Sequence, residues 1–271
     1  MKKLPKYKKA VILLLGILIC LLVFLLWRSR TLTVTEYTID SGEIPSAFDG
    51  FRIVHISDLH NTSFGKDNAR LVSEIRALSP DIIVITGDIV HSSPMENAVS
   101  FSRQAAAIAP TYYIPGNHEL RMDHQTLFSR LQEAGVILLL NENTEIIQNG
   151  QTINLAGLQD PAATPNMTIK DALQPLIRED AYNILLAHRP ERIDSYAACG
   201  ADLVLSGHTH GGQFHLPFLG ALYATGQGFF PVYDVGLFSV GDTQLLISQG
   251  LGPYRFGNPP EIVVITLKSR K

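Results

Sequence analysis

The stretch Gly207-His208-Thr209-His210-Gly211-Gly212 directly follows the apolar run from Asp202 to Ser206. Two histidines one residue apart, flanked by glycines at the end of a predicted strand, are typical of metal ligands on a strand-to-loop edge. One such motif has limited specificity by itself. We therefore searched outward along the chain for other strand ends that supply ligands of the same kind.

Other apolar runs also end in residues of metal-binding type. They are 53–57 before Asp58-Leu59-His60, 82–86 before Gly87-Asp88, 112–114 before Pro115-Gly116-Asn117-His118-Glu119, and 184–187 before His188. In open α/β sheets, ligands bind beyond the carboxyl ends of the strands. We therefore expect these strand ends to converge on one site.

Length, charge and cysteine content narrow the class of protein. The chain has 271 residues and a formal net charge of -3, so it is long enough to bury a sizeable core and has no basic excess. We therefore expect no nucleic-acid partner. Cys20 lies in the apolar N-terminal segment and Cys199 in the globular part, so no disulfide between them is expected. The cysteines do not decide the compartment, and the oligomeric state stays open.

The N-terminal segment is expected to anchor the chain in a membrane. The run from Ala10 to Trp27 is uninterruptedly apolar, and as a helix it would nearly span a hydrocarbon core about 30 Å thick. A cleaved signal peptide is the alternative, but Arg28-Ser29-Arg30 follows the run instead of a small-x-small cleavage pattern. We expect residues 1–30 to form a cytoplasmic basic tail and a single-pass transmembrane helix. Residues 31–271 are then the catalytic domain.

The charges that flank this segment predict its orientation. Lys2, Lys3, Lys6, Lys8 and Lys9 precede the apolar run, whereas Arg28 and Arg30 follow it. The positive-inside rule therefore keeps the N-terminus in the cytoplasm. The catalytic domain is expected outside the cell membrane.

The order of the predicted elements indicates a layered α/β domain. Expected helices span 67–78, 93–109, 122–134, 168–178 and 189–199. Expected strands include 51–57, 81–86, 111–114, 137–140, 145–148, 152–158, 236–240, 244–248 and 261–267, with a further strand before residue 50 and a hairpin turn at Asn149-Gly150. We find no internal repeat and no second domain boundary within this part.

The residue types fit a metal site with nitrogen and oxygen ligands. Asp58 and His60 are two residues apart, so on an extended chain both side chains point to the same face. The Asp88 carboxylate could bridge two ions, while Asn117 supplies a neutral oxygen and His188 a nitrogen. Such a mixture without thiolate fits Mn, Fe, Zn, Co or Ni better than Ca or Mg.

Taken together and in this order, these motifs resemble the calcineurin-like metallophosphoesterase family. The resemblance covers roughly residue 51 to the C-terminus and implies two mixed β-sheets flanked by helices. It implies one ion on Asp58, His60, Asp88 and His210, and a second on Asp88, Asn117, His188 and His208. His118 resembles the non-ligand histidine that contacts the phosphate and assists the leaving group, so Asp88 and His118 are the candidate catalytic residues. The tail with Gly250-Leu251-Gly252, Arg255 and Pro260-Glu261-Ile262 is similar to a membrane-anchored bacterial branch, and Asn117, His118 and Arg255 are the candidate substrate-binding residues.

The expected activity is hydrolysis of a phosphate ester, either a diester or a monoester of a lipid or envelope component. Two divalent ions about 3.5–4 Å apart can clamp a phosphate and lower the pKa of bound water towards about 7. His118 can then protonate the leaving alkoxide if Glu119 or Asp88 orients it. One alternative is a pyrophosphatase acting on a nucleotide-sugar lipid such as UDP-diacylglucosamine. Another is a non-catalytic metal-binding scaffold, which would not need His118.

Several residues receive simpler interpretations. His55 is expected in the core, and His91 receives no catalytic role. Asp160 could support the site from behind the ligands, but we favour its interpretation as a turn residue. Gly211-Gly212 is expected to leave room for phosphate. The apolar segment 214–233 either contacts lipid or, as we favour, covers the sheet.

Overall fold

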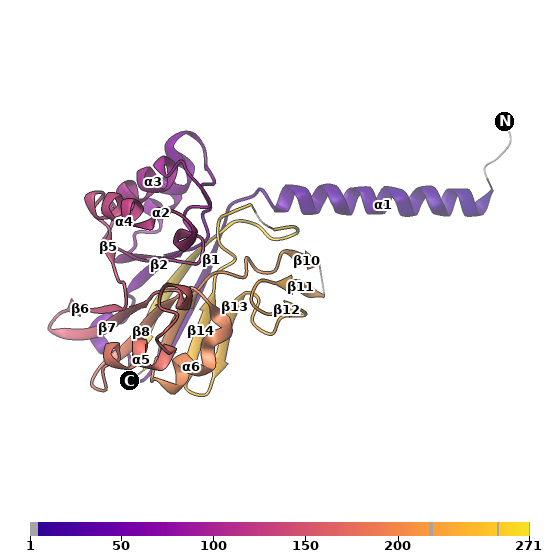
Figure 1. The fold of residues 1–271 in the computed structure, drawn as a ribbon. Helices are drawn as coiled ribbons and strands as arrows, with labels where there is room; N and C mark the ends of the chain where they lie inside the picture. Colours follow the sequence, from indigo (N-terminus) through magenta and orange to yellow (C-terminus); the bar gives the residue numbers. More distant parts are fainter. Residues whose placement is uncertain (1–4, 217–218, 254, 271) are drawn as a thin grey trace.

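The computed structural model describes residues 5–216, 219–253 and 255–270. Within them, two six-stranded sheets face each other, and helices cover their outer faces (Figure 1). Each sheet contains both parallel and antiparallel strand pairs. The predicted α/β sandwich of two mixed sheets flanked by helices is therefore confirmed.

The first sheet has the order β1-β15-β2-β3-β4-β5. Its strands are β1 (Thr33–Ser41), β15 (Glu261–Ser269), β2 (Arg52–Ile56), β3 (Ile82–Thr86), β4 (Thr111–Ile114) and β5 (Ile137–Leu138). Strand β15 is parallel to β1 and antiparallel to β2, whereas β2, β3, β4 and β5 are mutually parallel. Every residue of β3 is buried, as expected of an apolar strand covered on both faces.

The second sheet has the order β13-β14-β9-β8-β7-β6. Its strands are β13 (Gly236–Val240), β14 (Thr243–Ile247), β9 (Leu203–Ser206), β8 (Tyr182–Ala187), β7 (Gln151–Leu158) and β6 (Glu142–Gln148). The four inner strands are parallel, and β13 and β6 pair antiparallel at the two edges. The hairpin between β6 and β7 turns at Asn149 and Gly150, which both have positive φ angles as a two-residue turn of this kind requires.

Three apolar clusters hold the layers together. The middle cluster joins the facing sides of the two sheets, with Val84 and Ile184 among its members. A second cluster packs α2 (Ala69–Ala77), α3 (Glu96–Ala106) and α4 (His124–Glu133) on the first sheet. The third packs α5 (Ile169–Leu173) and α6 (Ile193–Ala198) on the second sheet. The carboxyl ends of the inner parallel strands are thereby fixed beside one another.

The N-terminal helix α1 (Lys6–Arg28) extends away from the sandwich (Figure 1). It is long and apolar enough to cross a membrane, and almost all of its described side chains are exposed. The 23 residues correspond to a helix about 34 Å long. Lys2 and Lys3, which contribute to the predicted orientation, lie outside the described residues.

Two predicted helices are shorter than expected. The helix predicted over 168–178 ends at Leu173, because Pro175 lacks an amide hydrogen and lies in a 3-10 turn. The helix predicted over 189–199 begins only at Ile193, after a 3-10 turn that starts at Pro190. The proline at each position favours the first turn of a helix over its interior.

The segment after the last ligand stretch contains a sheet that we did not predict. Strands β10 (Phe214–Leu216), β11 (Gly220–Ala224) and β12 (Gly228–Phe229) form a separate antiparallel sheet. The interpretation that this segment covers the main sheet is wrong for Phe229 and Phe230, since their side chains are 77% and 75% exposed. Phe218, which contributed to the apolar pattern, lies outside the described residues.

Candidate metal centre

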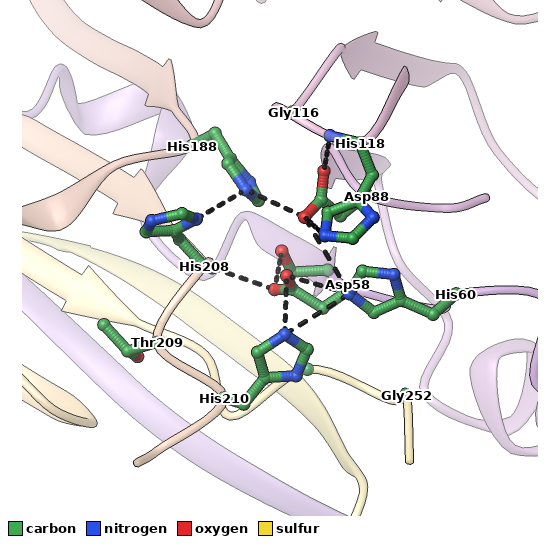
Figure 2. A network of polar contacts seen from close by, with 12 residues as sticks. Asp58, His60, Asp88, Gly116, His118, His188, His208, Thr209, His210 and Gly252 are labelled. Atoms are coloured by element: carbon green, nitrogen blue, oxygen red, sulfur yellow. Dashed lines mark hydrogen bonds and ion pairs between the residues drawn. The ribbon is translucent and has the colours of Figure 1, made fainter. Parts of the chain in front are cut away.

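The candidate ligands lie at the carboxyl ends of strands from both main sheets (Figure 2). They are Asp58 and His60 after β2, Asp88 after β3, His188 after β8, and His208 and His210 after β9. The remaining candidate, Asn117, follows β4. The chain segments that carry them are hydrogen-bonded to each other: the amide of Asp58 donates to Gly87, and the amide of Gly207 donates to His188. The predicted strand ends therefore meet at one place.

Many of these residues have an unusual backbone conformation. Asp58, His60, Asp88, His208 and His210 have φ angles of 51°, 47°, 51°, 71° and 55°. A positive φ costs a non-glycine residue on the order of 1–3 kcal/mol, and such residues cluster at functional sites. The turns after the strands direct these side chains towards one another.

Asp58, His60 and His210 form the first cluster of potential ligands. Nε2 of His60 lies 3.3 Å from Nε2 of His210, and Oδ1 of Asp58 lies 3.8 Å and 3.6 Å from these two nitrogens. The other oxygen of Asp58 accepts hydrogen bonds from Ser57 Oγ and from the amide of His208. One carboxylate oxygen is thus held by the protein, and the other faces the imidazoles.

Asp88, His188 and His208 form the second cluster. Nε2 of His188 lies 3.3 Å from Oδ2 of Asp88 and 3.1 Å from Nδ1 of His208. The same Oδ2 lies 3.8 Å from Nε2 of His60, which belongs to the first cluster. Asp88 therefore lies between the two clusters, while His208 and His210 fall into different ones.

A hydrogen bond fixes the orientation of His188. Its Nδ1 lies 2.7 Å from the carbonyl oxygen of Thr86, which can only accept, so Nδ1 carries the proton. Nε2 is therefore the nitrogen that faces the site. A backbone carbonyl behind an imidazole is a common support for a metal-binding histidine.

The donor atoms fit divalent metal ions. Oδ1 of Asp58 and Oδ1 of Asn117 are buried, and neither accepts a hydrogen bond from the described residues. Burial above all lowers the pKa values of His60 and His210 to about 3, so both imidazoles are neutral near pH 7, as metal ligation requires. Burial disfavours the charged form of His188 as well, but Asp88 reverses this and raises its pKa to about 10. Without a cation, the carboxylates draw a proton onto His188.

Two glycines are required beside the carboxylates. A Cβ atom on Gly207 would collide with the side chains of Ser57 and Asp58, and one on Gly116 would collide with Asp88. Gly211 and Gly212 have another role than the one expected: their carbonyls accept hydrogen bonds from Asn258 Nδ2, and Cβ atoms there would meet protein atoms. The expectation that they leave space for phosphate is wrong.

His118 lies at the rim of the site, outside both clusters. Its amide donates to Oδ1 of Asp88 at 2.8 Å, and its Nε2 lies 4.0 Å from Oδ2 of the same carboxylate. Its side chain is 20% exposed, in contrast to the fully buried His60 and His188 side chains. Asp88 is thus positioned to orient His118.

Glu119 does not orient His118, contrary to one of the two sequence-based options. Its Oε1 accepts from the amides of Ile89 and Val90, and its Oε2 accepts from the amides of Asp88 and Gly116. Burial and then the Asp88 charge raise the pKa of Glu119 to about 8, whereas the amide donors act in the opposite direction. The side chain joins the loop after β3 to the loop after β4.

Two neighbours of the site were not predicted from the sequence. His91 contacts His118, with ring centroids 4.8 Å apart, and it belongs to a third cluster with His60 and His118. Arg189 lies 3.4 Å from Nε2 of His208 and forms an ion pair with Asp160 at 2.6 Å. Asp160 also caps a turn, but it is buried, so its interpretation as only a turn residue is incomplete. A signal for Arg189 is its place directly after the predicted ligand His188.

Arg255 is mostly engaged by its own loop. Its Nε donates to the carbonyl of Gly252, and its Nη1 donates to the carbonyls of Gln249, Gly250 and Pro259. Nη2 is buried and has no hydrogen-bond partner among the described residues. Only this nitrogen remains for the predicted contact with substrate.

His55 is fully buried and bonded to Thr86 Oγ1, as a core residue should be.

Comparison with known proteins identifies the family. The model of the calcineurin-like phosphoesterase family matches residues 51–212. The chain therefore belongs to the calcineurin-like phosphoesterase family. Membership makes the protein a hydrolase of phosphoester bonds, and members of the family typically bind divalent metals.

Relatives from distant organisms share most of the chain. It is 33% identical to the metallophosphoesterase YkuE of Bacillus subtilis, over 87% of this chain and 85% of that protein. It is 32% identical to a zebrafish (Danio rerio) transmembrane protein with metallophosphoesterase domain, over 87% of this chain and 57% of that protein. Among solved structures, phosphopantetheinyl hydrolase from Mycobacterium tuberculosis aligns with 74% of this chain and 89% of its own, with a TM-score of 0.48 and 12% identity.

Proposed function

We propose that this protein is a dinuclear metal-dependent hydrolase that cleaves a phosphodiester or phosphomonoester of a lipid or envelope component. The position of Asp88 between two buried clusters of potential ligands is the observation that carries this proposal. The first ion would be held by Asp58, His60, Asp88 and His210, and the second by Asp88, Asn117, His188 and His208. Mn, Fe, Zn, Co and Ni fit these nitrogen and oxygen donors.

The ions would supply Lewis acidity and lower the pKa of a water molecule between them. The chain's own residues then bind and orient the ester. His118 stands beside the clusters with an exposed edge, so it can contact the phosphate and donate a proton to the leaving oxygen. Asp88 holds the amide of His118 and thereby its position.

We further propose that α1 anchors residues 31–271 to the cell membrane, with the catalytic domain on the extracytoplasmic side. The length and apolarity of α1 support the anchor, and the lysines before it support the orientation. Protease treatment of intact cells should therefore degrade the domain; full protection in intact cells, with degradation after lysis, would contradict the orientation.

The catalytic proposal is tested with the full chain in detergent and bis(4-nitrophenyl) phosphate as substrate. We expect Mn-dependent turnover that Asp88→Asn abolishes together with metal binding. His118→Ala should retain the metal and lose about 10²–10⁴-fold in kcat on an alkyl ester, but less on the nitrophenyl ester, whose leaving group needs no proton. His124→Ala, which removes an imidazole at the start of α4, is the control. Full metal occupancy without turnover of any ester would instead indicate a metal-binding scaffold.

A further inference from the structure

The small sheet β10–β12 and its turns expose large apolar side chains in one part of the chain. Phe214 is 55% exposed, Leu219 and Val232 are 71% exposed, and Phe229 and Phe230 are 77% and 75% exposed. We refer to these five residues as the apolar rim. Scattered apolar side chains are ordinary on protein surfaces, but a group of this size within one segment indicates a contact surface.

The apolar rim is attached to the end of the membrane-spanning helix. Ser29 Oγ, just after α1, accepts a hydrogen bond from the amide of Gly257 at 3.0 Å. Leu25 is buried in spite of its place in an otherwise exposed helix, and its Cδ2 is 3.6 Å from the Cβ position of Gly257. The neighbouring Phe256 accepts a hydrogen bond from the amide of His215 in β10. The last turn of α1 is thus connected to β10.

The direction of the small sheet agrees with these contacts. In Figure 1, β10, β11 and β12 project from the sandwich on the side on which α1 leaves it. A bilayer crossed by α1 would therefore meet the small sheet at the same level as the end of the helix. Arg28 and Arg30 follow the apolar part of α1, at the level where lipid phosphate groups would lie.

Because the end of α1 and the small sheet are connected and lie on the same side of the sandwich, we propose that the apolar rim docks into the headgroup region of the bilayer that α1 crosses. The inference rests on the membrane anchoring proposed above and deepens it, because it makes lipids with phosphate-bearing headgroups the substrate class. Phe and Leu side chains on membrane-surface segments insert into the boundary between the headgroups and the acyl chains. The domain would then be held at the bilayer by two contacts, so its orientation relative to the lipid headgroups would be fixed.

A cavity beside the apolar rim has the residues to receive such a lipid. It has a volume of about 350 Å³ and is lined by Gln213, Phe214, Arg255 and Phe256. Arg255 is connected to the first cluster by hydrogen bonds: its Nε donates to the carbonyl of Gly252, and the amide of Gly252 donates to the carbonyl of Asp58. A lipid could place its apolar part beside Phe214 and Phe256 and its phosphate towards Arg255 and His210.

Quenching of tryptophan fluorescence by brominated lipids tests the docking directly. The chain has one tryptophan, Trp27, at the end of α1. In a Trp27→Phe background, Phe229→Trp places the only tryptophan in the apolar rim. Ile147→Trp in the same background is the matched control, because Ile147 in β6 is 66% exposed and lies in the second main sheet. All variants are reconstituted as full chains in vesicles of phosphatidylcholine brominated near the upper part of the acyl chains.

We expect at least twofold stronger quenching in the Phe229→Trp variant than in the Ile147→Trp variant, and strong quenching of the native Trp27 in the unsubstituted chain. Quenched Trp27 with equal values for the two variants would overturn the docking and leave the anchor intact. Unquenched Trp27 would overturn the anchor and, with it, the docking. Neither result affects turnover of a soluble ester, so failure of the catalytic proposal is measured separately.

Two substrates with the same leaving group test the consequence for activity. Phe229→Ser combined with Phe230→Ser should change turnover of soluble bis(4-nitrophenyl) phosphate less than twofold. Turnover of 4-nitrophenyl phosphatidate in vesicles should fall at least tenfold. Equal loss on both substrates would show a packing role, and equal retention would show that the rim does not deliver lipid. A dimer in detergent that this double variant dissociates would assign the surface to a second copy of the chain and overturn the proposal.

Discussion

Arg189 brings a positive charge next to the second cluster. Asp160 binds its guanidinium, whose Nη1 reaches to 3.4 Å from His208 Nε2. Asp160 accepts from Nε and Nη2, and Nη1 also lies 3.6 Å from Oε1 of Glu191, so the remaining guanidinium hydrogens can offer a phosphate a charge-assisted hydrogen bond. Arg189 is therefore suited to hold the substrate anion.

Replacement of Arg189 should weaken substrate binding more than it slows the chemical step. A charge-assisted hydrogen bond contributes about 1.5–3 kcal/mol, and about 1.4 kcal/mol corresponds to a factor of ten. We expect Arg189→Gln to raise KM for bis(4-nitrophenyl) phosphate about tenfold or more, with a smaller change in kcat. Asp160→Asn should act in the same direction, and Arg192→Gln, in an exposed neighbour, should have no effect. A loss confined to kcat would contradict this role.

At the scale of elements, the loops after β3 and β4 are held together by one side chain. Both oxygens of Glu119 accept amide hydrogen bonds, so the four amides that face this side chain require acceptor atoms there. The longer arm of glutamate, compared with aspartate, reaches the loop that carries Asp88. The orientation of a bridging ligand thus depends on a residue that binds no metal itself.

Glu119→Gln should destabilise the fold and reduce metal content together. The introduced NH₂ group would face amide donors and could not accept from them, and leaving a buried donor without an acceptor costs about 1–3 kcal/mol. We expect a lower midpoint of thermal unfolding and lower metal content in the purified protein. Glu133→Gln removes an exposed carboxylate from α4 and should change neither. An unchanged midpoint in Glu119→Gln would refute the role of the four amide contacts.

The sequence predicted elements whose signals are local. The run 82–86 is apolar throughout and became β3, and the turn Asn149-Gly150 became the hairpin between β6 and β7. The C-terminus of α5 and the N-terminus of α6 were predicted wrongly. A proline near each boundary removes one backbone hydrogen bond, and this local effect does not alter the apolar pattern of the helix. Strands β10 to β12 were missed because their residues show no clear alternation and are interrupted by glycines.

The same reasoning applies to the site. The ligand candidates could be found because each follows an apolar strand directly, so their convergence follows from the sheet. The contact of Glu119 with Asp88 and that of Arg189 with Asp160 could not be predicted, because the residues are 31 and 29 positions apart in sequence and meet only through the packing of loops. Hydrogen bonds of this kind leave no periodic pattern in the sequence.

At the scale of the whole molecule, the candidate metal centre is built from residues of both sheets. Asp58, His60, Asp88 and Asn117 come from the first sheet, whereas His188, His208 and His210 come from the second. Ions bound between them would link the halves of the sandwich. Ligands that bind only the folded state stabilise it by mass action.

Metal removal should therefore lower the stability of the entire domain. We expect EDTA to lower the midpoint of thermal unfolding of the detergent-solubilised chain by several degrees, and added Mn to restore it. Asp88→Asn should unfold at a lower temperature that no longer depends on EDTA. If EDTA abolished activity but left the midpoint of the wild-type protein unchanged, the ions would not link the sheets.

Strand β15 lies between β1 and β2, although it is the last described strand in sequence. During synthesis, β1 emerges directly after α1, and among the described strands it pairs only with β15. At about 5–20 residues per second, the ribosome adds the intervening segment before β15 exists. The first sheet, whose strands β2 and β3 precede Asp58 and Asp88, can therefore be completed only after nearly the whole domain has been made. Maturation of this enzyme thus follows translation instead of accompanying it.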